Sequence, residues 1–179
     1  MTLRGKLVAD LGAMELMIRE GLDLATSLDT GGVKQRVDLD SLLSSVCADA
    51  IDAGQNVTLS GETHASVLGI PIALQRCLAN LIDNAVKYGG YARVVAEREG
   101  DKAVIRVRDG GPGIPEAQME RVFDPYYRVE TSRSRETGGT GLGLTIVHQI
   151  IQEHHGEILV KSSIGVGTTF FVSLPALPE

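Results

Sequence analysis

The amino-acid sequence predicts an α+β fold, a sandwich in which helices cover one face of a mixed sheet, preceded by one long helix. Helix-like and strand-like segments follow one another without the regular strand–helix–strand alternation of parallel sheets. The strand-like segments are short, and glycine turns separate several of them. The chain has 179 residues, of which 43% are hydrophobic, enough for one globular core with a helical extension.

The N-terminal segment from about Thr2 to Ser27 predicts a single helix, because its apolar residues recur every three or four positions. The resulting apolar seam consists of Leu7, Leu11, Met14, Ile18, Leu22 and Ala25. Such a helix is long for a small domain, so we expect its seam to pack against another helix, another chain or both. Glycine and polar residues in Leu28–Arg36 then predict a linker.

The remainder of the chain mixes predicted helices and strands. Helices are expected over Asp40–Ala53, Pro71–Tyr88 and Leu142–Glu153. Strands are expected over Asn56–Ser60, Ala65–Leu68, Ala92–Glu97, Ala103–Asp109, Glu157–Ser162 and Thr168–Leu174. Asp40 suits a helix cap, Pro71 suits a first helical turn, and the Gly89-Gly90 pair suits a helix end.

Composition excludes several functional classes. A net charge of −6 and an aromatic content of 4% argue against nucleic-acid binding, which needs a basic surface. Cys47 and Cys77 form no CxxC pair, so we expect buried free thiols in a reducing cytosol rather than a disulfide or a zinc site. No apolar run is long enough for a membrane span, and the N-terminus lacks a signal-peptide pattern.

Polar side chains form a stripe on the predicted helix Pro71–Tyr88. Asn80, Asn84 and Tyr88 recur at intervals of four, with Lys87 beside them, and the other face of the helix is apolar. An amide oxygen is a hard ligand suited to Mg²⁺, and a nearby lysine supplies positive charge for a phosphate. A solvated helix face is the alternative, and it is the commoner meaning of an isolated Asn-x-x-x-Asn.

A second polar motif, Asp109-Gly110-Gly111-Pro112-Gly113, follows a strand in which Ile105, Val107 and Asp109 face one side. A carboxylate at the end of an inward-facing apolar row needs a donor. The amino group of adenine would serve, whereas the oxo group of guanine would repel it. Gly111 and Gly113 would let the backbone pass close to the base. A plain β-turn is the alternative.

A third motif, the glycine-rich segment 138–144, opens the helix Leu142–Glu153. Free backbone N–H groups at a helix start, preceded by glycines, predict a phosphate site. It is not a Rossmann fingerprint, because Leu144 stands in place of the last glycine, nor a Walker loop, because Gly-Lys-Ser/Thr is absent from the sequence. The polar segment Val122–Gly138 is long for a connection and predicts a lid. Its arginines are Arg128, Arg133 and Arg135.

In their order and spacing, four segments together resemble the sequence boxes of bacterial sensor histidine kinases. They are Asn-Leu-Ile-Asp-Asn-Ala-Val-Lys-Tyr (80–88), Asp-Gly-Gly-Pro-Gly-Ile (109–114), Phe-Asp-Pro-Tyr-Tyr-Arg (123–128) and Gly-Thr-Gly-Leu-Gly-Leu (139–144). The terminal Gly-Val-Gly-Thr-Thr-Phe (165–170) also resembles the last strand pair of that family. The resemblance extends from about Val37 to Pro175.

The resemblance implies the Bergerat ATP-binding sandwich shared with gyrase, mismatch-repair and chaperone ATPases, holding ATP and Mg²⁺. It implies that Asn84 is the principal magnesium ligand, supported by Asn80, and that Asp109 accepts from the adenine amine. The implied catalytic residues are Asn84, Lys87 and Arg128. The implied nucleotide-binding residues are Asn80, Asn84, Lys87, Tyr88, Asp109, Gly111, Gly113, Ile114, Tyr127, Arg128, Arg133, Arg135, Gly139, Thr140, Gly141, Leu142, Gly143, Leu144 and Thr168.

One position distinguishes a kinase from a hydrolase. In the related ATPases a glutamate four residues before the magnesium asparagine activates water. Asn80 occupies that position here and cannot act as a base, which implies transfer to another acceptor with only slow hydrolysis. Asp83 is acidic but is expected to point away from the stripe. Two positions depart from the family pattern. Gly69 stands where the family often has a helix-capping Asp, and Glu157 stands where it usually has the second glycine of a His-Gly-Gly.

The resemblance also divides the chain into three parts. Residues 1–28 resemble the second helix of the dimerisation and phosphotransfer hairpin, residues 29–36 a linker, and residues 37–179 the ATP-binding catalytic domain. The phosphoacceptor histidine of the first hairpin helix is absent, so a fragment, or a partner that phosphorylates a histidine elsewhere, is implied. None of His64, His148, His154 and His155 is expected to accept phosphate. The last three lie on or just after a helix, where a role at its C-terminal dipole is expected.

The implied partners are a histidine hairpin of the same kinase family, a response regulator and, through helix 2–27, a second copy of the chain; no nucleic acid is expected. The domain is expected in the cytoplasm, with its full-length parent anchored in the inner membrane. Two alternatives remain open. One is an anti-sigma-factor serine kinase of the same fold, and the other is a nucleotide-sensing interaction module without catalysis.

Overall fold

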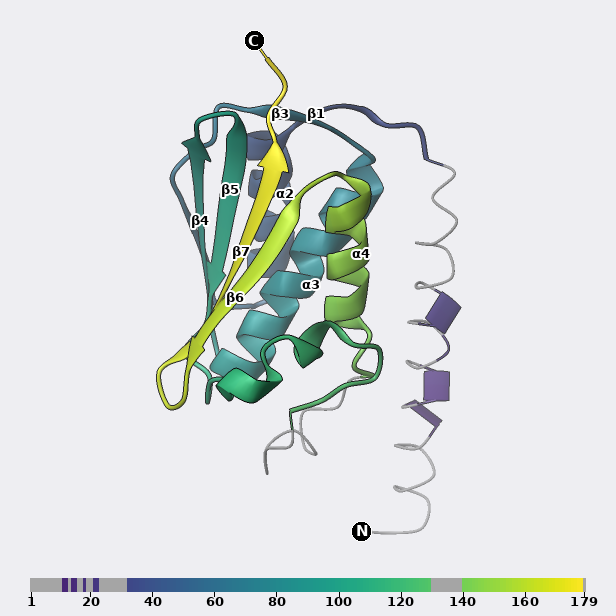
Figure 1. Ribbon diagram of the computed structural model, residues 1–179, viewed down its shortest axis with the longest axis vertical. Helices are drawn as coiled ribbons and strands as arrows, with labels where there is room; N and C mark the ends of the chain where they lie inside the picture. The colour runs from purple at the N-terminus through teal and green to yellow at the C-terminus, as the bar shows by residue number, and fades with distance from the viewer. Residues whose placement is uncertain are drawn as a thin grey trace, which may run out of the picture.

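A computed structural model describes residues 32–129 and 140–178, together with seven residues between Leu11 and Leu22. These residues form a two-layer sandwich, in which helices lie against one face of a five-stranded sheet (Figure 1). The elements are β1 (Gln35–Asp38), α2 (Leu39–Asp52), β2 (Val57–Ser60), β3 (Ser66–Gly69), α3 (Pro71–Gly89), β4 (Ala92–Glu99), β5 (Lys102–Arg108), the short 3₁₀ helices η1 (Glu116–Gln118) and η2 (Arg121–Phe123), α4 (Gly143–Glu153), β6 (Glu157–Ser163) and β7 (Gly167–Pro175).

The sheet is mixed, as the sequence predicts. Its strand order is β2-β4-β5-β7-β6, with β2 parallel to β4 and the other neighbours antiparallel. β1 and β3 form a separate antiparallel pair. The register places Ile105 opposite both Ala96 and Val172, and all three side chains are buried. This alternation turns one face of the sheet toward the helices, as a two-residue side-chain period requires.

Helix α3 forms the centre of the helical layer. Pro71 begins it, and Gly90, in the left-handed region at φ 76°, ends it with a hydrogen bond from its N–H to the carbonyl of Val86, as expected for these residue types. Its buried face packs on the sheet and on α4, whose own buried face consists of Ile146, Val147, Ile150 and Ile151. Cys47 and Cys77 are free and buried in this core, as predicted.

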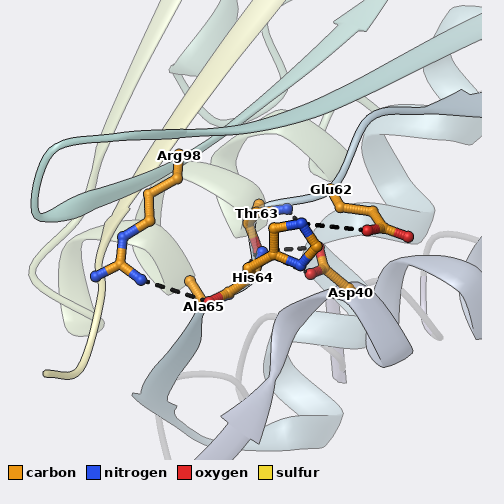
Figure 2. A network of polar contacts seen from close by, with 6 residues as sticks. All are labelled: Asp40, Glu62, Thr63, His64, Ala65 and Arg98. Carbon is orange, nitrogen blue, oxygen red and sulfur yellow. Dashed lines mark hydrogen bonds and ion pairs between the residues drawn. The ribbon is translucent and has the colours of Figure 1, made fainter. Parts of the chain in front are cut away.

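The cap of α2 differs from the prediction. Asp38 is the cap residue, and its carboxylate accepts a hydrogen bond from the backbone N–H of Ser41 at 2.9 Å. Asp40 instead lies in the first turn of the helix and holds the loop that precedes β3. Figure 2 shows its carboxylate directed at Thr63 and His64, whose backbone N–H groups both donate to it at 2.8 Å. Asp38 therefore provides the local cap, and Asp40 makes a contact across the fold.

Three elements were not predicted, namely β1, η1 and η2. β1 takes up Gln35 and Arg36, so the expected linker over 29–36 ends inside a strand. The four expected seam residues that the structure describes, Leu11, Met14, Ile18 and Leu22, are helical and 59–62% exposed. The rest of the expected N-terminal helix lies outside the described residues. Within the described part of the chain, no helix combines the length and apolar character that a membrane span needs.

Candidate functional site

A pocket of about 260 Å³ opens at the C-terminal end of α3. Its walls come from α3, from the loop after β5, from the segment that follows η2, and from the start of α4. The predicted site residues that line it are Asn80, Asn84, Lys87, Tyr88, Asp109, Gly113, Ile114, Tyr127, Arg128, Thr140, Gly141, Gly143, Leu144 and Thr168. Segments separated by up to 88 positions in the sequence thus meet at one cavity.

Five predicted site residues are not among this lining. Gly111 lies behind the wall, where its N–H supports Asp109. Leu142 is fully buried in the core, so it supports the glycine loop from below instead of facing the cavity. Arg133, Arg135 and Gly139 lie outside the described residues.

The polar stripe of α3 faces the pocket, whereas Leu78, Leu81, Ile82 and Ala85 on the same helix are buried. The side-chain N–H₂ of Asn80 makes a long contact of 3.5 Å with the carbonyl oxygen of Gly143, which links the stripe to the start of α4. Asp83 departs from its expected position, because it also lines the pocket. Its Oδ1 accepts a hydrogen bond from Gln55 at 2.8 Å.

Asp109 is the buried carboxylate of the pocket, with only 6% of its surface exposed. Its Oδ1 accepts from the N–H of Gly111 at 2.7 Å and from that of Thr168 at 3.2 Å. Burial raises the pKa of this carboxyl above its usual value, although both backbone donors and nearby Arg108 act in the opposite direction. The hydrogen bonds found among the described residues all use Oδ1, which leaves Oδ2 for a donor in the pocket.

The hydroxyls of Ser162 in β6 and Thr168 in β7 form a hydrogen-bonded pair beside Asp109. The sequence analysis predicted Thr168 as a site residue but did not predict Ser162. Ser162 Oγ lies 2.8 Å from Thr168 Oγ1 and donates to the carbonyl of Gly167 at 3.0 Å. Because a hydroxyl has one proton, Thr168 must then donate to Ser162, which leaves the lone pairs of Thr168 for the cavity. Ser162 also accepts from the N–H of Ile114 at 2.8 Å. Ser162 was missed because no local motif marks it.

Gly113 is required by a backbone contact. Its φ is 80°, and an added Cβ would lie 2.3 Å from the carbonyl oxygen of Ser163. We expected glycine at position 113 because it leaves room for a base. The close passage of the β6–β7 turn is a stronger reason why no side chain fits there.

The glycine loop is tied to the segment after η2. The carbonyl of Gly141 accepts from the N–H of Tyr126 at 3.1 Å, and a Cβ on Gly141 would meet the Tyr126 backbone at 2.9 Å. Tyr127 is flanked by Arg121, whose Cζ lies 4.4 Å from the centre of the ring. The loop and the segment that carries Tyr127 and Arg128 therefore form one continuous wall.

Apolar residues that the sequence analysis did not single out complete the lining. They are Pro112, Val122, Val129 and Phe170. Phe170 could have been found, because it lies two positions after Thr168 on the inward-facing side of β7. Val122 and Val129 lie in the segment that the sequence predicts as a lid, but no periodic pattern marks either of them as a lining residue.

Asp109 lies beside Gly89 at the end of α3, whereas Gly143 at the start of α4 lies beside Asn80 and Asn84, further back along that helix. The start of α4 is therefore at the opposite end of the pocket from Asp109, and the loop before it offers donors. The first i to i−4 hydrogen bond of α4 runs from Ile146 N to Leu142 O, so the helix does not use the N–H groups that precede it. Thr140 Oγ1 is buried and, among the described residues, has no hydrogen-bond partner. Together with Lys87, which also lines the pocket, these groups suit an anion. The pocket therefore has a carboxylate acceptor at one end and anion-binding groups at the other.

A comparison with protein families finds one match over most of this domain. The family model described as "Histidine kinase-, DNA gyrase B-, and HSP90-like ATPase" matches residues 69–178. That range contains all four sequence boxes.

Curated relatives are similar over nearly the whole chain. The sensor histidine kinase GtrS of Pseudomonas aeruginosa is 34% identical over 175 residues, which cover 98% of this chain and 36% of that protein. The sensor-like histidine kinase SenX3 of Mycolicibacterium smegmatis is 36% identical over 173 residues, which cover 93% of this chain and 44% of that protein. The chain thus spans less than half the length of these relatives.

Solved structures agree with the fold. The crystal structure of the ATP binding domain of PrrB from Mycobacterium tuberculosis superimposes with a TM-score of 0.66 at 27% identity, covering 81% of this chain and 98% of that domain. The predicted sandwich fold and the resemblance to sensor histidine kinases are both confirmed.

Proposed function

We propose, on the premise that this chain belongs to the family of histidine kinase-, DNA gyrase B- and HSP90-like ATPases, that its pocket holds ATP with Mg²⁺ and donates the γ-phosphoryl group to a histidine. The acceptor would belong to the hairpin of a two-component sensor kinase. The observation that carries the proposal is the polarity of the pocket, in which Asp109 lies beside Gly89 at the end of α3 and the start of α4 lies beside Asn80 and Asn84. A nucleotide has the matching polarity, with an amine on its base and phosphates at its far end.

At the base end, Oδ2 of Asp109 would accept from the adenine amine. Oδ1 is occupied by Gly111 and Thr168, so the carboxylate is held in place before any ligand arrives. The hydroxyl of Thr168 would join the same network through its lone pairs. Guanine carries an oxo group where adenine carries the amine, so the same carboxylate would repel it. The pocket is therefore expected to prefer adenine.

At the phosphate end, the N–H groups before α4 and the hydroxyl of Thr140 would bind the phosphate oxygens. Lys87 and Arg128 would place positive charge there. Tyr127 also lines the pocket. We extend the same role to Arg133, Arg135 and Gly139 from their positions in the sequence.

Asn84, with Asn80 in support, would hold Mg²⁺. The donor set fits this ion, because amide oxygens are hard ligands and Mg²⁺ usually keeps waters and shares substrate phosphates. The described residues contain no cluster of three or more His, Cys, Asp or Glu that could hold a metal ion. A bound Mg²⁺ would supply charge neutralisation at the phosphates.

In the transfer, the bond between the γ-phosphorus and the bridging oxygen breaks while a bond forms to an imidazole nitrogen of the acceptor. ADP leaves with the negative charge of that oxygen. Lys87 and Arg128 would stabilise the charge that develops, and Asn84 would keep the phosphates aligned. A base outside this chain would take the imidazole proton.

Among the described residues, the pocket offers no base of the kind that fast hydrolysis requires. Of the described residues that line it, only Asp83 and Asp109 are carboxylates. Asp83 is hydrogen-bonded to Gln55, and Asp109 lies at the base end. Purified protein should therefore hydrolyse ATP far more slowly than one turnover per second, as a phosphate-release assay would measure. Several turnovers per second would contradict the kinase assignment.

The partners and the location follow from the same proposal. A histidine hairpin and a response regulator would be the partners, and a second copy of the chain would pack along helix 2–27. Leu11, Met14 and Ile18 are exposed along that helix. Because the site would need ATP, we propose that the domain lies in the cytoplasm. From the family alone, we propose that the full-length parent protein is anchored in the inner membrane.

Calorimetry with a non-hydrolysable ATP analogue, with and without Mg²⁺, tests the site. Asn84→Ala should weaken binding and abolish the dependence on Mg²⁺, whereas Asp109→Ala should weaken binding and retain that dependence. Asn56→Ala is the matched control, because Asn56 is exposed and lies outside the pocket. Unaltered binding in both pocket variants would overturn the assignment of the site.

Transfer is tested with ATP labelled in the γ-phosphate, a histidine hairpin from a related sensor kinase, and a serine-containing anti-sigma substrate. We expect an acid-labile phosphate on the hairpin and none on the serine protein. Label on the serine protein alone would indicate the serine kinase alternative. Nucleotide binding without transfer to either would indicate the interaction module.

A further inference from the structure

His154 joins the ends of the two helices that carry the pocket. It follows the last residue of α4, and only 4% of its surface is exposed. Its Nε2 accepts from the backbone N–H of Ile70 at 2.9 Å, and its Nδ1 lies 2.6 Å from the carbonyl oxygen of Ile150. Ile70 is the residue before the first turn of α3, where no side chain of the helix itself provides a cap.

These two contacts determine where the ring proton lies. The N–H of Ile70 is a donor, so Nε2 must present its lone pair to it. Nδ1 then carries the proton and donates to Ile150, which makes the imidazole neutral with both nitrogens used. At the C-terminus of α4, where a role for His154 was expected, the neutral ring donates from Nδ1 to the carbonyl of Ile150. The contact with Ile70 was not predicted.

The surroundings of His154 favour this neutral form. Burial lowers the pKa of its imidazole, and the carbonyl of Ile150 acts in the opposite direction. Three charged or titratable neighbours also act on it. Lys34 and His155 lower the pKa and Glu153 raises it. Lys34 is itself held at this end of α4, because its Nζ donates to the carbonyl of Glu153 at 2.6 Å.

Gly69 makes room for the ring. An added Cβ at Gly69 would lie 2.7 Å from Cδ2 of His154 and 2.7 Å from Cδ1 of Leu74. Both are too close for a real Cβ. A side chain at position 69 and the imidazole of His154 therefore exclude each other.

The contact with Ile70 has a counterpart at the pocket. α3 and α4 run antiparallel, because the start of α3 meets the end of α4 at Ile70 and His154, while Asn80 approaches Gly143 at the start of α4. Ile70 and Asn84 are about 20 Å apart along the helix. The hydrogen bond at His154 therefore fixes one end of a helix pair whose other end carries the ligand-facing groups.

We propose that His154 is a positioning residue, whose neutral ring sets the axial position of α4 against α3 and thereby the spacing between the glycine loop and the Asn84 stripe. The inference rests on the proposed nucleotide site. It also makes nucleotide affinity sensitive to acid, since protonation turns Nε2 into a donor that faces the N–H of Ile70. Affinity is then full at neutral pH and falls as the pH drops below the range near 6.5 in which free histidine titrates.

Three variants test the proposal. His154→Leu removes the acceptor and leaves the N–H of Ile70 without a partner. His154→Gln keeps an acceptor, since its side-chain oxygen is as many bonds from the backbone as Nε2, and it does not titrate. His155→Asn is the matched control, because His155 is exposed and its φ of 57° is one that asparagine accepts. Each full-length chain is titrated with Mg²⁺ and a non-hydrolysable ATP analogue from pH 5 to pH 8.

At neutral pH, His154→Leu should bind at least about fivefold more weakly, whereas His154→Gln should stay within about twofold of the wild type. The ratio of the wild-type affinity to that of His154→Gln should fall as the pH drops. The titration of the nucleotide itself affects both proteins equally, so it cancels in this ratio. His155→Asn should keep the wild-type affinity at neutral pH and, because His155 lowers the pKa of His154, lose affinity in acid at a slightly higher pH than the wild type. If His154→Leu binds like the wild type, or if the ratio is constant with pH, the proposal is wrong.

A measurement without nucleotide separates this proposal from that of the binding site. Ring nitrogen shifts in NMR spectra should identify the Nδ1–H form of His154, and the amide of Ile70 should exchange faster in His154→Leu than in the wild type or His154→Gln. Equal exchange in all three would overturn the role of His154. A wild-type chain that binds no nucleotide, but gives these NMR results, would fail the proposed function and leave the contact itself intact.

Discussion

The backbone N–H of Gly111 donates to Oδ1 of Asp109 at 2.7 Å, so the carboxylate that faces the pocket also holds the turn beside it. Thr168 donates to the same oxygen from β7. One oxygen of the side chain therefore supports the structure, and the other is the one that we propose accepts from the ligand. A substitution at this position can be chosen to change one role and keep the other.

Asp109→Asn should change nucleotide preference while the fold is retained. The two backbone N–H groups select the amide oxygen, so the N–H₂ group turns toward the pocket. It then faces the adenine amine as a second donor, and affinity for an ATP analogue should fall at least about tenfold. The corresponding GTP analogue, with its oxo group, should bind better relative to ATP than it does to the wild type. Calorimetry measures both, with the exposed Asp101→Asn as the control; an unchanged ratio of the two affinities would contradict adenine recognition by Asp109.

Adenine binding should weaken in acid through Asp109 itself. Burial raises the pKa of this carboxyl, so in the folded protein it takes up a proton above the pH at which a free carboxyl would. The protonated carboxyl therefore stabilises the nucleotide-free folded protein at pH values below its pKa in the unfolded chain. This contribution to stability is lost as the pH rises through its pKa in the folded protein. Nucleotide affinity changes with pH in the opposite direction, because binding the adenine amine needs the unprotonated carboxylate oxygen.

The measurement is the pH dependence of ATP-analogue affinity in the His154→Gln background, where the other proposed titration is absent. Affinity should decrease as the pH falls through the raised pKa of Asp109. Adding Asp109→Asn to that background should flatten the profile. A profile that keeps its slope in the double variant would assign the titration to another group.

Gly113→Ala should destabilise the chain more than Gly165→Ala. Both glycines have positive φ, 80° and 75°, so both substitutions carry the left-handed penalty of about 1 kcal/mol. Only at Gly113 does the added Cβ meet a backbone oxygen, that of Ser163 at 2.3 Å, whereas Gly165 has open space around it. Urea unfolding should give a loss of about 2 kcal/mol or more for Gly113→Ala. Equal losses for the two variants would mean that the β6–β7 turn moves aside freely.

Asp40→Ala should lower stability without affecting the pocket. The carboxylate accepts from both backbone N–H groups of Thr63 and His64 and from the hydroxyl of Thr63, which is fully buried. Without it, buried donors lose their partner, which should lower the free energy of unfolding by about 2 kcal/mol. ATP-analogue affinity in the folded variant should stay at the wild-type value, because Asp40 is not part of the pocket lining. Asp38→Ala, which removes only a helix cap, is the comparison and should have the smaller effect.

Most of the fold could be predicted because its signals are local. The limits of α3 depend on Pro71 and on the glycines at its end, and the buried rows of β5 and β7 depend on alternation within each strand. The stripe of Asn80, Asn84 and Tyr88 is likewise a matter of helical period. β1, with four residues, was missed because it exists only through its pairing with β3, about 30 positions further along.

The order of the elements and the candidate nucleotide-binding residues could be predicted from local patterns, because helical period, strand alternation and short glycine motifs act over a few neighbouring positions. The contacts that hold those residues in place depend on how distant segments pack. Ser162 supports Ile114 across 48 positions, and His154 caps α3 across 84. Such hydrogen bonds form only after packing has removed water from both partners and brought their atoms within about 3 Å, and no local pattern encodes that encounter.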